Sequence, residues 1–544
     1  PDALTAINLV MPLTTFVTAL STLIGLGPAI MAAKFIGKRQ TEKVNSIYSS
    51  ALYQAILIGG LQSVLLWVFL PQVGDWLCSN GQLLPYLMNY IEVLPFSFFL
   101  LMIVDTLISL IEADGHPNLA SKAVFLGCVL NVMLDVVLVK HFSFGTQGLA
   151  LAMTANYLTV LLYFLFRMRR EGVSYQWTKP KRSTINVTKA GLKEGMPMMI
   201  NDLLYSLMIF GVNSLLLIHY GENELYFWAI FLQLLLLVMV IVDCAEGAVL
   251  SIGSVLEGED DKFGLRALVK RIWIQVSSIV LLIVFFIWLF PTQIALLFGD
   301  SNNVPSEWPQ AVRILSLMLV PYALTTFMRS VFQVLGNRLT GVFFSLGQFV
   351  LIVGSLYLST RWNKELLWWC FPIAAWLLFG MQMLYLLIVS HVKKISNFSI
   401  IPLSPKKNFL DLSVAYNNES VTEATQHVCH FLQKHKVDTL TEIEINICCE
   451  ELMTNIVQFQ TYKTRSYMDL SIALEEHRVF LVLKDSGRPF IPVLPSSNPD
   501  PLEEDNVPLG LYLVNRVCTE ISHKYMYGLN VVIVEFDRRA QKRY

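Results

Sequence analysis

The sequence predicts a polytopic α-helical membrane protein followed by a smaller α+β domain. Of its 544 residues, 54% are hydrophobic and only 15% are charged, and the mean hydropathy is +0.54. This balance lies outside that of an ordinary soluble chain. From about residue 408 polar and apolar residues become mixed, and the remaining segment is long enough for one compact domain.

Before residue 395, about eleven apolar stretches are long enough to cross a bilayer, for which a helix needs about 20 residues. The expected spans are 3–33, 47–70, 86–111, 119–139, 147–168, 196–219, 224–252, 270–290, 309–334, 339–359 and 366–391.

Lys and Arg are concentrated in alternate loops. The loop "AKFIGKRQTEK" and the long loop after residue 168 are basic, whereas "PQVGDWLCSNGQLLP" has no Lys or Arg. Because basic loops are retained in the cytoplasm, the tail is expected there and residue 1 outside. An odd number of spans with an outside start predicts a further helix before Pro1.

Two pairs of segments resemble each other at a separation of about 220 residues. Residues 21–43 resemble 242–262, and residues 93–118 resemble 319–338. Equal orientation requires an even number of spans per repeat, so we expect two six-helix lobes, the first without its first helix. The expected divisions are a first lobe at 1–168, a basic cytoplasmic loop at 169–195, a second lobe at 196–392, a linker at 393–407 and a cytoplasmic domain at 408–544.

Two segments carry a family resemblance. "VLNVMLDVVLVKHFSFGTQGLALAMTANY" has an Asn, an Asp four residues later and a Gly-led run with Thr, and "AGLKEGMPMMINDLLYSLMIFGVNSLLL" has a Gly-x-Pro start. They resemble the fifth to seventh helices of the multidrug and toxic compound extrusion (MATE) transporters. The resemblance covers about residues 1–395. It implies a multi-pass protein of the bacterial inner membrane that exports amphipathic or cationic small molecules in exchange for H⁺ or Na⁺.

Carboxylates within the spans of the first lobe are candidate ion sites, because an ionised group at the bilayer centre costs at least about 2.5–3.5 kcal/mol. Asn131 and Asp135 lie one helical turn apart and could hold a proton or a small cation, and Asp105 and Thr154 could complete the pocket. The resemblance implies the ion site of the first lobe at Asn131, Asp135 and Thr154. The alternative is that Asp135 faces water near the end of its span.

The second lobe has its own candidates for a transport or cation site. A Pro or Gly close to an acid in a span is typical of bent or unwound helix that lines a cavity, as at Pro197 and Gly247. Interior packing is the alternative. Arg329 either pairs with one of the acids or extends to the cytoplasmic boundary. The candidates are Asn201, Asp202, Asp243 and Glu246.

The tail alternates strand and helix patterns. Period-two alternation predicts strands at "LDLSVAY", "YMDLSIAL", "RVFLVLKDSG" and "LNVVIVEFD", and amphipathic periodicity predicts helices at "ESVTEATQHVCHFLQKHK", "LTEIEINICCEELMTNIVQFQ" and "GLYLVNRVCTEI". The expected fold is a sheet covered on one face by helices.

Three motifs of the tail follow one another in this order: "CEELMTNIVQF", "LKDSGRPFIP" and "NVPLGLYLVNRV". They resemble the N box, the Asp-x-Gly box and the later Gly box of the GHKL (Bergerat-type) ATPases, most closely the anti-sigma-factor serine kinases. No GxxxxGK[ST] occurs, so a P-loop motor is not expected.

The GHKL resemblance implies a site for ATP with Mg²⁺. Asn455 would hold the Mg²⁺ ion, and Glu451, one turn earlier, would position or deprotonate the attacking hydroxyl or water. Asp485 would accept a hydrogen bond from the adenine amino group, and Gly487 would let the backbone approach the base. Gly510 would open a helix N-terminus toward the phosphates.

The tail departs from the GHKL pattern in two places. Pro508 and Leu509 stand where further glycines are usual, and no His follows Asn455 closely. Nucleotide binding is therefore favoured over efficient phosphotransfer. No phosphoacceptor segment precedes the domain, which argues against a sensor histidine kinase.

These observations favour an ion-coupled multidrug antiporter with a cytoplasmic ATP-binding domain that regulates it or signals. The alternative is a receptor whose transporter-like half senses a ligand and whose tail is a serine/threonine kinase or a sequestering module for a regulatory protein of the anti-anti-sigma kind. The net charge of −1 and the dispersed basic residues give no reason to expect nucleic acid as a partner. The eight scattered cysteines have no zinc-ligand spacing.

Overall fold

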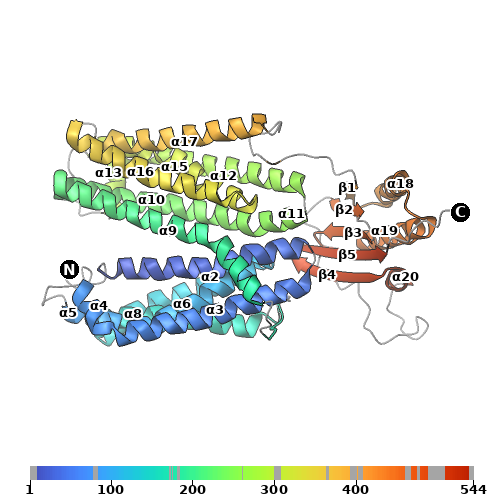
Figure 1. Ribbon diagram of the computed structural model, residues 1–544, viewed down its shortest axis with the longest axis horizontal. Helices are drawn as coiled ribbons and strands as arrows, with labels where there is room; N and C mark the ends of the chain where they lie inside the picture. Colours follow the sequence, from blue (N-terminus) through green and yellow to red (C-terminus); the bar gives the residue numbers. More distant parts are fainter. Residues whose placement is uncertain are drawn as a thin grey trace. The chain divides into compact units, whose positions relative to one another are not determined.

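The computed structural model forms two compact units, Pro1–Leu403 and Ser404–Tyr544 (Figure 1). Within them it describes residues 9–38, 40–77, 84–170, 173, 175–179, 184–259, 261–298, 308–362, 367–392, 401, 408–459, 467–474, 478–487 and 509–537. The start of the first expected span and almost all of the expected linker lie outside the described residues.

The first unit is helical, and eleven helices in its described part are long and apolar enough to cross a membrane. This confirms the predicted polytopic fold. The first lobe holds α2 (Met11–Gly37), α3 (Thr41–Val68), α4 (Leu70–Leu77), α5 (Leu84–Ile91), α6 (Leu94–Ala113), α7 (Pro117–Val136), the π-helical segment η1 (Val137–His141) and α8 (Gly145–Arg167). The second lobe holds α9 (Thr184–His219), α10 (Glu222–Ala248), the π-helical segment η2 (Val249–Gly253), α11 (Ser254–Gly258), α12 (Lys262–Leu289), α13 (Pro291–Phe298), α14 (Trp308–Ser316), α15 (Leu319–Val334), α16 (Arg338–Trp362) and α17 (Leu367–Val392).

Some expected spans differ from the helices observed. Helix α9 begins at Thr184 rather than near 196, because its first turns contain Lys189, Lys193 and Glu194, which lower the hydropathy without preventing a helix. The expected span 86–111 is two helices, α5 with α6, whereas 309–334 is confirmed as one span, Trp308–Val334, with a turn between α14 and α15. A proline near the start of α6 and of α15 suits a new first turn better than a helix interior.

The two lobes repeat one local design. Helices α6 and α15 both follow a short helix, and both end before a glycine with positive φ, 89° at Gly115 and 78° at Gly336. The next amide closes the helix end in each case, His116 N to Ile111 O at 3.1 Å and Asn337 N to Phe332 O at 2.8 Å. A left-handed glycine suits this helix ending, because it has no Cβ to clash.

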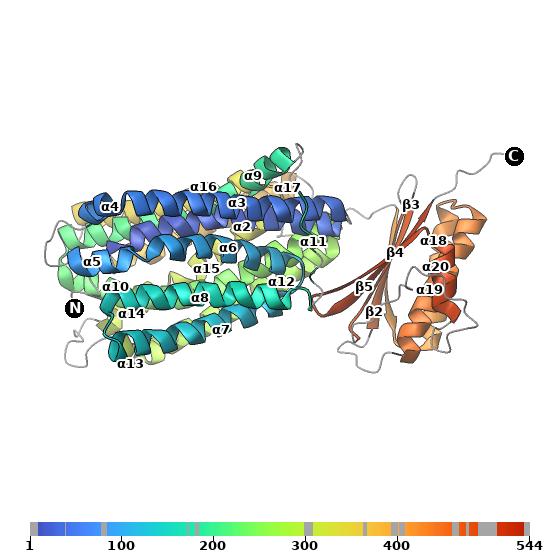
Figure 2. The same cartoon turned by 90° about the horizontal axis from the view of Figure 1, so that it is seen from below.

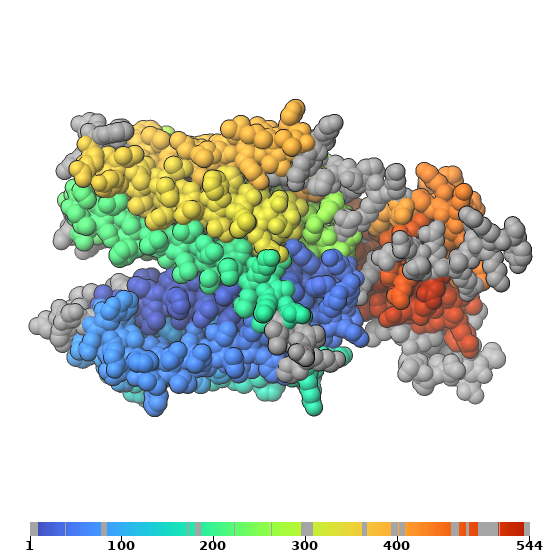
Figure 3. Space-filling view, viewed as in Figure 1, coloured from blue at the N-terminus to red at the C-terminus, as the bar shows by residue number. Residues whose placement is uncertain are grey.

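The lobes meet at one end of the helical unit. In Figure 3 a hollow separates the blue atoms of the first lobe from the green atoms of the second at one end, whereas blue and green atoms touch further along. Helix α2 packs on α6 and α3 of its own lobe and on α9 and α11 of the other. This helix is therefore the one through which the lobes contact each other most extensively.

The second unit is an antiparallel sheet with helices on one face, as Figure 2 shows. Its strands are β1 (Phe409–Ala415), β2 (Tyr467–Leu474), β3 (Arg478–Asp485), β4 (Glu520–Met526) and β5 (Leu529–Asp537), in the order β1-β2-β3-β5-β4. The helices are α18 (Asn418–Lys434), α19 (Thr439–Phe459) and α20 (Leu509–Val517). Alternate residues of the strands and the inner faces of the helices form one apolar core.

The predicted α+β fold of the tail is confirmed, with one correction. The expected helix "GLYLVNRVCTEI" ends at Val517, and its last residues, Glu520 and Ile521, begin strand β4. The strand sequence "EISHKYM" is polar, contains His and Lys, and lacks a clear apolar alternation.

Candidate functional site

Asp105 of the first lobe is held by helix α2. Its side chain is half-buried on α6, and the Ser21 hydroxyl of α2 donates to its Oδ2 at 2.7 Å. Ser21 is buried.

The other first-lobe candidates contact different partners. Thr154 of α8 lies 2.5 Å from the Ser97 hydroxyl of α6, and both are buried. Asn131 and Asp135 lie half-buried on α7, the latter just before the π segment η1. Asp135 interacts electrostatically with a tyrosine of α5, and Asp105 with a tyrosine of α8. The four candidates of the first lobe thus lie in one lobe, but each contacts different partners. The two tyrosines, which the sequence analysis missed, are Tyr90 and Tyr157.

The acids of the second lobe gather around Arg329 of α15. Glu246 Oε1 lies 3.9 Å from Arg329 Nε, and both side chains are mostly buried. Asp202 on α9 and Asp243 on α10 also interact electrostatically with this guanidinium. Of the two expectations for Arg329, pairing with the acids is the one observed. Asp243 is the most exposed of the three carboxylates.

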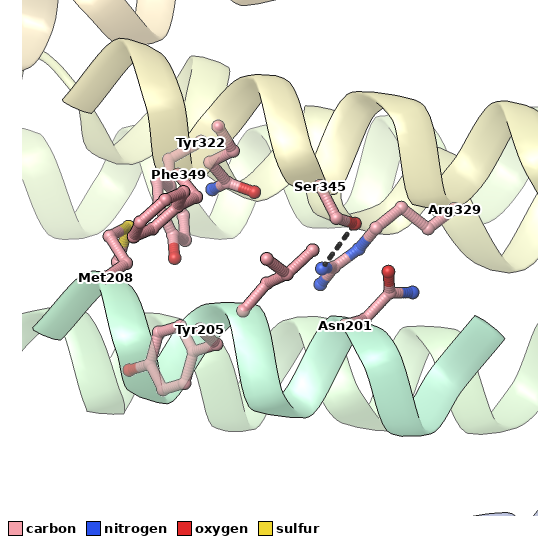
Figure 4. Close-up of a pocket in the computed structure, with 9 residues that line it drawn as sticks. Asn201, Tyr205, Met208, Tyr322, Arg329, Ser345 and Phe349 are labelled. Atoms are coloured by element: carbon pink, nitrogen blue, oxygen red, sulfur yellow. Dashed lines mark hydrogen bonds between the residues drawn. The ribbon is translucent and has the colours of Figure 1, made fainter. Parts of the chain in front are cut away.

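A small pocket lies beside Arg329 (Figure 4). The guanidinium donates to the Ser345 hydroxyl at 3.3 Å and to the Thr326 carbonyl at 3.2 Å. Figure 4 shows Asn201 and Tyr205 on α9 along one side of this space. Three buried polar atoms around the pocket have no hydrogen-bond partner among the described residues, namely Asn201 Oδ1, Tyr205 Oη and Gln348 Nε2.

Helix α2 also reaches the second lobe. The Thr22 hydroxyl, which donates to the Thr18 carbonyl at 3.1 Å, also interacts with the Asp202 carboxylate of α9. Ser21 and Thr22 are consecutive residues, so one turn of α2 contacts a carboxylate in each lobe.

Glycines let the backbones of the two lobes touch at the C-terminal half of α2. A Cβ at Gly27 would lie 2.5 Å from the amide nitrogen of Gly195 on α9. A Cβ at Gly37 would lie 2.9 Å from the Cα of Gly258 on α11. Any larger residue would force these helices apart, because real Cβ atoms do not approach so closely.

Charged residues surround this glycine contact. Glu194, one residue before Gly195, pairs with Arg338 of α16, and Gln333 Nε2 donates to the Glu194 carbonyl at 2.8 Å. Lys34 of α2 interacts electrostatically with Glu194 and with Glu257 of α11. The closed end of the unit is therefore held by both backbone packing and charge.

In the tail, α19 places Glu451 and Asn455 one turn apart, as expected. Asn455 Nδ2 donates to the Glu451 carbonyl at 2.8 Å, which directs the amide oxygen away from that turn. Helix α20 packs on α19 and lies against the Glu451 side chain, since a Cβ at Gly510 would overlap the Glu451 carboxylate. The structure thus brings together Glu451, Asn455 and Gly510.

Asp485 ends strand β3 in a buried polar cluster. Its Oδ1 accepts from Gly487 N at 2.7 Å and from Asn530 Nδ2 at 3.3 Å. Asn530 Oδ1 in turn lies 3.1 Å from His523 Nε2, and burial lowers the pKa of His523 below its usual value. Neither Asn530 nor His523 was foreseen. The sequence could have indicated Asn530, because this polar residue lies on the same face of its strand as the buried Val532 and Val534.

In the described part of the chain, no three His, Cys, Asp or Glu side chains are grouped so that they could hold a metal ion.

The fold is that of a two-lobed, polytopic helical membrane protein with an α+β tail. The profile of the MatE family matches residues 1–137 and 197–358, and that of the histidine kinase-like ATPase domain matches residues 414–536. The chain belongs to the MatE family and carries a C-terminal histidine kinase-like ATPase domain.

Characterised relatives are distant. The multidrug export protein MepA of Staphylococcus aureus (strain MRSA252) is 23% identical over 251 residues, 45% of this chain and 55% of MepA. MepA of Staphylococcus haemolyticus (strain JCSC1435) is also 23% identical, over 249 residues. The chain thus spans about half the length of the curated relatives that it matches.

Solved structures share the fold of the helical unit. An outward-facing multidrug resistance MATE family transporter of the MOP superfamily matches with a TM-score of 0.66 and 22% identity, over 73% of this chain and 89% of that one. A MOP superfamily transporter from Pyrococcus furiosus matches with a TM-score of 0.65 and 22% identity, over 71% of this chain and 87% of the other.

Proposed function

We propose that the protein is an antiporter of the bacterial inner membrane that exports amphipathic or cationic small molecules in exchange for H⁺ or Na⁺. Its cytoplasmic tail binds ATP with Mg²⁺ and regulates the transporter or signals from it. The relatives named multidrug export protein support the class of substrate. The many-helix fold supports a multi-pass membrane protein.

The observation that carries the transport proposal is the contact of one turn of α2 with carboxylates of both lobes. Ser21 reaches Asp105 in the first lobe, and Thr22 reaches Asp202 in the second. A proton or Na⁺ bound at either carboxylate changes the interaction of that carboxylate with α2, which is also the helix that closes one end of the unit. Binding therefore biases the arrangement of the lobes.

The two acid sites have different electrostatic settings in this proposal. Asn131, Asp135 and Thr154 belong with Asp105 to the first-lobe site, whose charge is negative. Asn201, Asp202, Asp243 and Glu246 belong to the second-lobe site, where Arg329 offsets part of the negative charge. A cationic substrate or a coupling ion that enters the second site takes over part of the neutralisation of these carboxylates from Arg329.

The tail supplies the ATP-binding residues. Asn455 would offer its amide oxygen to Mg²⁺, and the ion would offset the negative charge of the phosphates. Glu451 positions or activates the group that attacks the γ-phosphate, and Asp485 with Gly487 receives adenine. Gly510 lets the start of α20 approach the phosphates. A cytoplasmic protein of the anti-anti-sigma kind is the partner we propose for this domain.

Transport into proteoliposomes tests the acid sites. The full-length protein is assayed with a cationic dye under an imposed H⁺ or Na⁺ gradient, without nucleotide. Asp105→Asn and Asp202→Asn keep the side-chain size and remove the charge, so each is expected to reduce gradient-driven transport at least about tenfold, in line with the differential binding that coupling requires. Asp75→Asn, on the exposed face of α4, is the matched control and should transport normally.

Two other outcomes are informative. Transport that survives both substitutions would remove these carboxylates from the coupling mechanism. No transport under any gradient, together with phosphorylation or capture of a protein by the tail in response to a ligand, would establish the receptor interpretation instead.

A further inference from the structure

The adenine end of the tail's proposed nucleotide site is built across three adjacent strands. Asp485 is the last residue of β3, and Asn530 lies directly opposite it on β5. His523 on β4 pairs with Val532, so it is a diagonal neighbour of Asn530 on the same face of the sheet. Figure 1 shows β3, β5 and β4 side by side in this order.

This face is otherwise the apolar core. The rows that lead to Asp485 and Asn530 consist of Leu481 and Leu483 on β3 and of Val532 on β5, all buried. Asp485 is 1% exposed and Asn530 is fully buried. Polar groups that replace apolar ones at the end of a core are costly unless they are hydrogen-bonded, and here they bond to one another.

The hydrogen bonds fix the direction of the Asn530 amide. Its Nδ2 donates to Asp485 Oδ1 and to the Gly487 carbonyl at 3.4 Å, and both of these atoms only accept. The amide oxygen therefore faces His523, and an amide oxygen also only accepts. His523 Nε2 must carry the proton of the 3.1 Å bond.

The hydrogen bonds to Asp485 also favour one ionisation state of its carboxyl group. Its Oδ1 accepts from Gly487 N and Asn530 Nδ2, which favours the ionised carboxylate over the acid. An ionised carboxylate can only accept. It pairs with the 6-amino group of adenine and repels the 6-oxygen of guanine, which is also an acceptor.

We propose that Asn530 and His523 are positioning residues that make the tail's site selective for adenine over guanine nucleotides. Asn530 holds Asp485 as an oriented acceptor, and His523 prevents the Asn530 amide from turning its oxygen toward Asp485. The inference rests on the proposed ATP binding by the tail and adds the residues that choose the base. The low pKa of His523 agrees with a neutral ring, whose proton is on Nε2.

The test compares binding of AMP-PNP and GMP-PNP to the full-length protein in nanodiscs. Wild type should prefer AMP-PNP. His523→Leu removes the donor to Asn530, and Asn530→Asp places a second carboxylate beside Asp485, so that the pair shares a proton and Asp485 can donate to guanine. In both variants Asp485 is no longer fixed as an ionised acceptor, which weakens its bond from the adenine amino group. Each is therefore expected to lower the preference for adenine by about tenfold or more, the usual loss for a hydrogen bond to a charged group.

Two control variants separate this role from general damage. His523→Gln keeps a side-chain N–H donor and should retain most of the preference. Ser522→Ala, one residue earlier on the opposite, exposed face of β4, should match wild type. A ratio that stays at the wild-type value in folded His523→Leu and Asn530→Asp would overturn the inference and leave ATP binding intact.

A second measurement needs no destabilising variant. ¹⁵N-histidine NMR of the wild-type protein reports which ring nitrogen of His523 is protonated, with the signal assigned by its absence in His523→Gln. Protonation at Nε2 is expected, and protonation at Nδ1 alone would overturn the inference. If wild type binds neither nucleotide, the proposed ATP binding itself fails and the inference falls with it.

Discussion

Asp485 is the residue on which the proposed nucleotide site depends most. It is almost completely buried, and its carboxylate is oriented by an amide of its own turn and by Asn530. Asp485→Asn should lower the affinity for AMP-PNP by about tenfold to a hundredfold, because a charge-assisted hydrogen bond contributes about 1.5–3 kcal/mol. Isothermal titration on the full-length protein measures this. Glu520→Gln, exposed on β4, is the control, and equal losses in both variants would contradict the role of Asp485.

His523 predicts a pH dependence of the tail's stability. Burial lowers its pKa in the folded state, whereas the unfolded chain titrates near about 6.5. Between the lowered pKa and about 6.5 the unfolded state binds more protons than the folded state. The free energy of unfolding therefore falls as the pH falls through this window, and the stabilising contribution of neutral His523 is complete above it. Hydrogen exchange of β4 and β5 should show this decline in wild type. His523→Gln should flatten it, and an unchanged slope in that variant would refute the assignment.

Single residues differ in how far the sequence could reveal them. Glu451, Asn455 and Gly510 were proposed together from motif order, and the structure places them together because α19 and α20 pack on each other. Ser21 and Thr22 carry no such signal, since small hydroxyl residues are common in membrane helices. Their contacts with Asp105 and Asp202 depend on how α2 packs against both lobes, which no local pattern encodes.

Among the elements, α2 is the one whose packing decides the state of the transporter. Gly27→Ala puts a Cβ 2.5 Å from Gly195 N, so the lobes must separate at this end. We expect greater thiol labelling of a Cys introduced at Lys34 in this variant. Gly380→Ala on α17 is the matched control, because nothing lies within 4 Å of its Cβ and its effect should stay below about 1 kcal/mol. Equal labelling of the two variants would show that the glycine contact does not close the lobes.

Element types were predictable where the periodicity was long and regular. The eleven long helices and strands β1, β2, β3 and β5 match the expected segments in kind. Strand β4 was missed because its stability comes from pairing with β5, a long-range contact, rather than from its own polar sequence. The start of α9 was missed because hydropathy detects the membrane part of a helix and not its charged extension.

At the scale of the whole molecule, the internal sequence repeat predicts two lobes of similar structure. The paired endings at Gly115 and Gly336 show that the repeat extends to backbone conformation. The positions of Lys and Arg place the closed end, where α2 finishes at Gly37, on the cytoplasmic side in our proposal. In this proposal the hollow between the lobes faces the outside, where the coupling ion enters and the exported molecule leaves.

The central claim is that an ion gradient, rather than ATP, drives export. Cationic-dye transport by full-length protein in proteoliposomes tests it most directly, with an H⁺ or Na⁺ gradient and no nucleotide in one arm and with ATP and no gradient in the other. We predict uphill transport in the gradient arm alone, with ATP altering its rate only when a gradient is present. Uphill transport by ATP without a gradient would contradict the account.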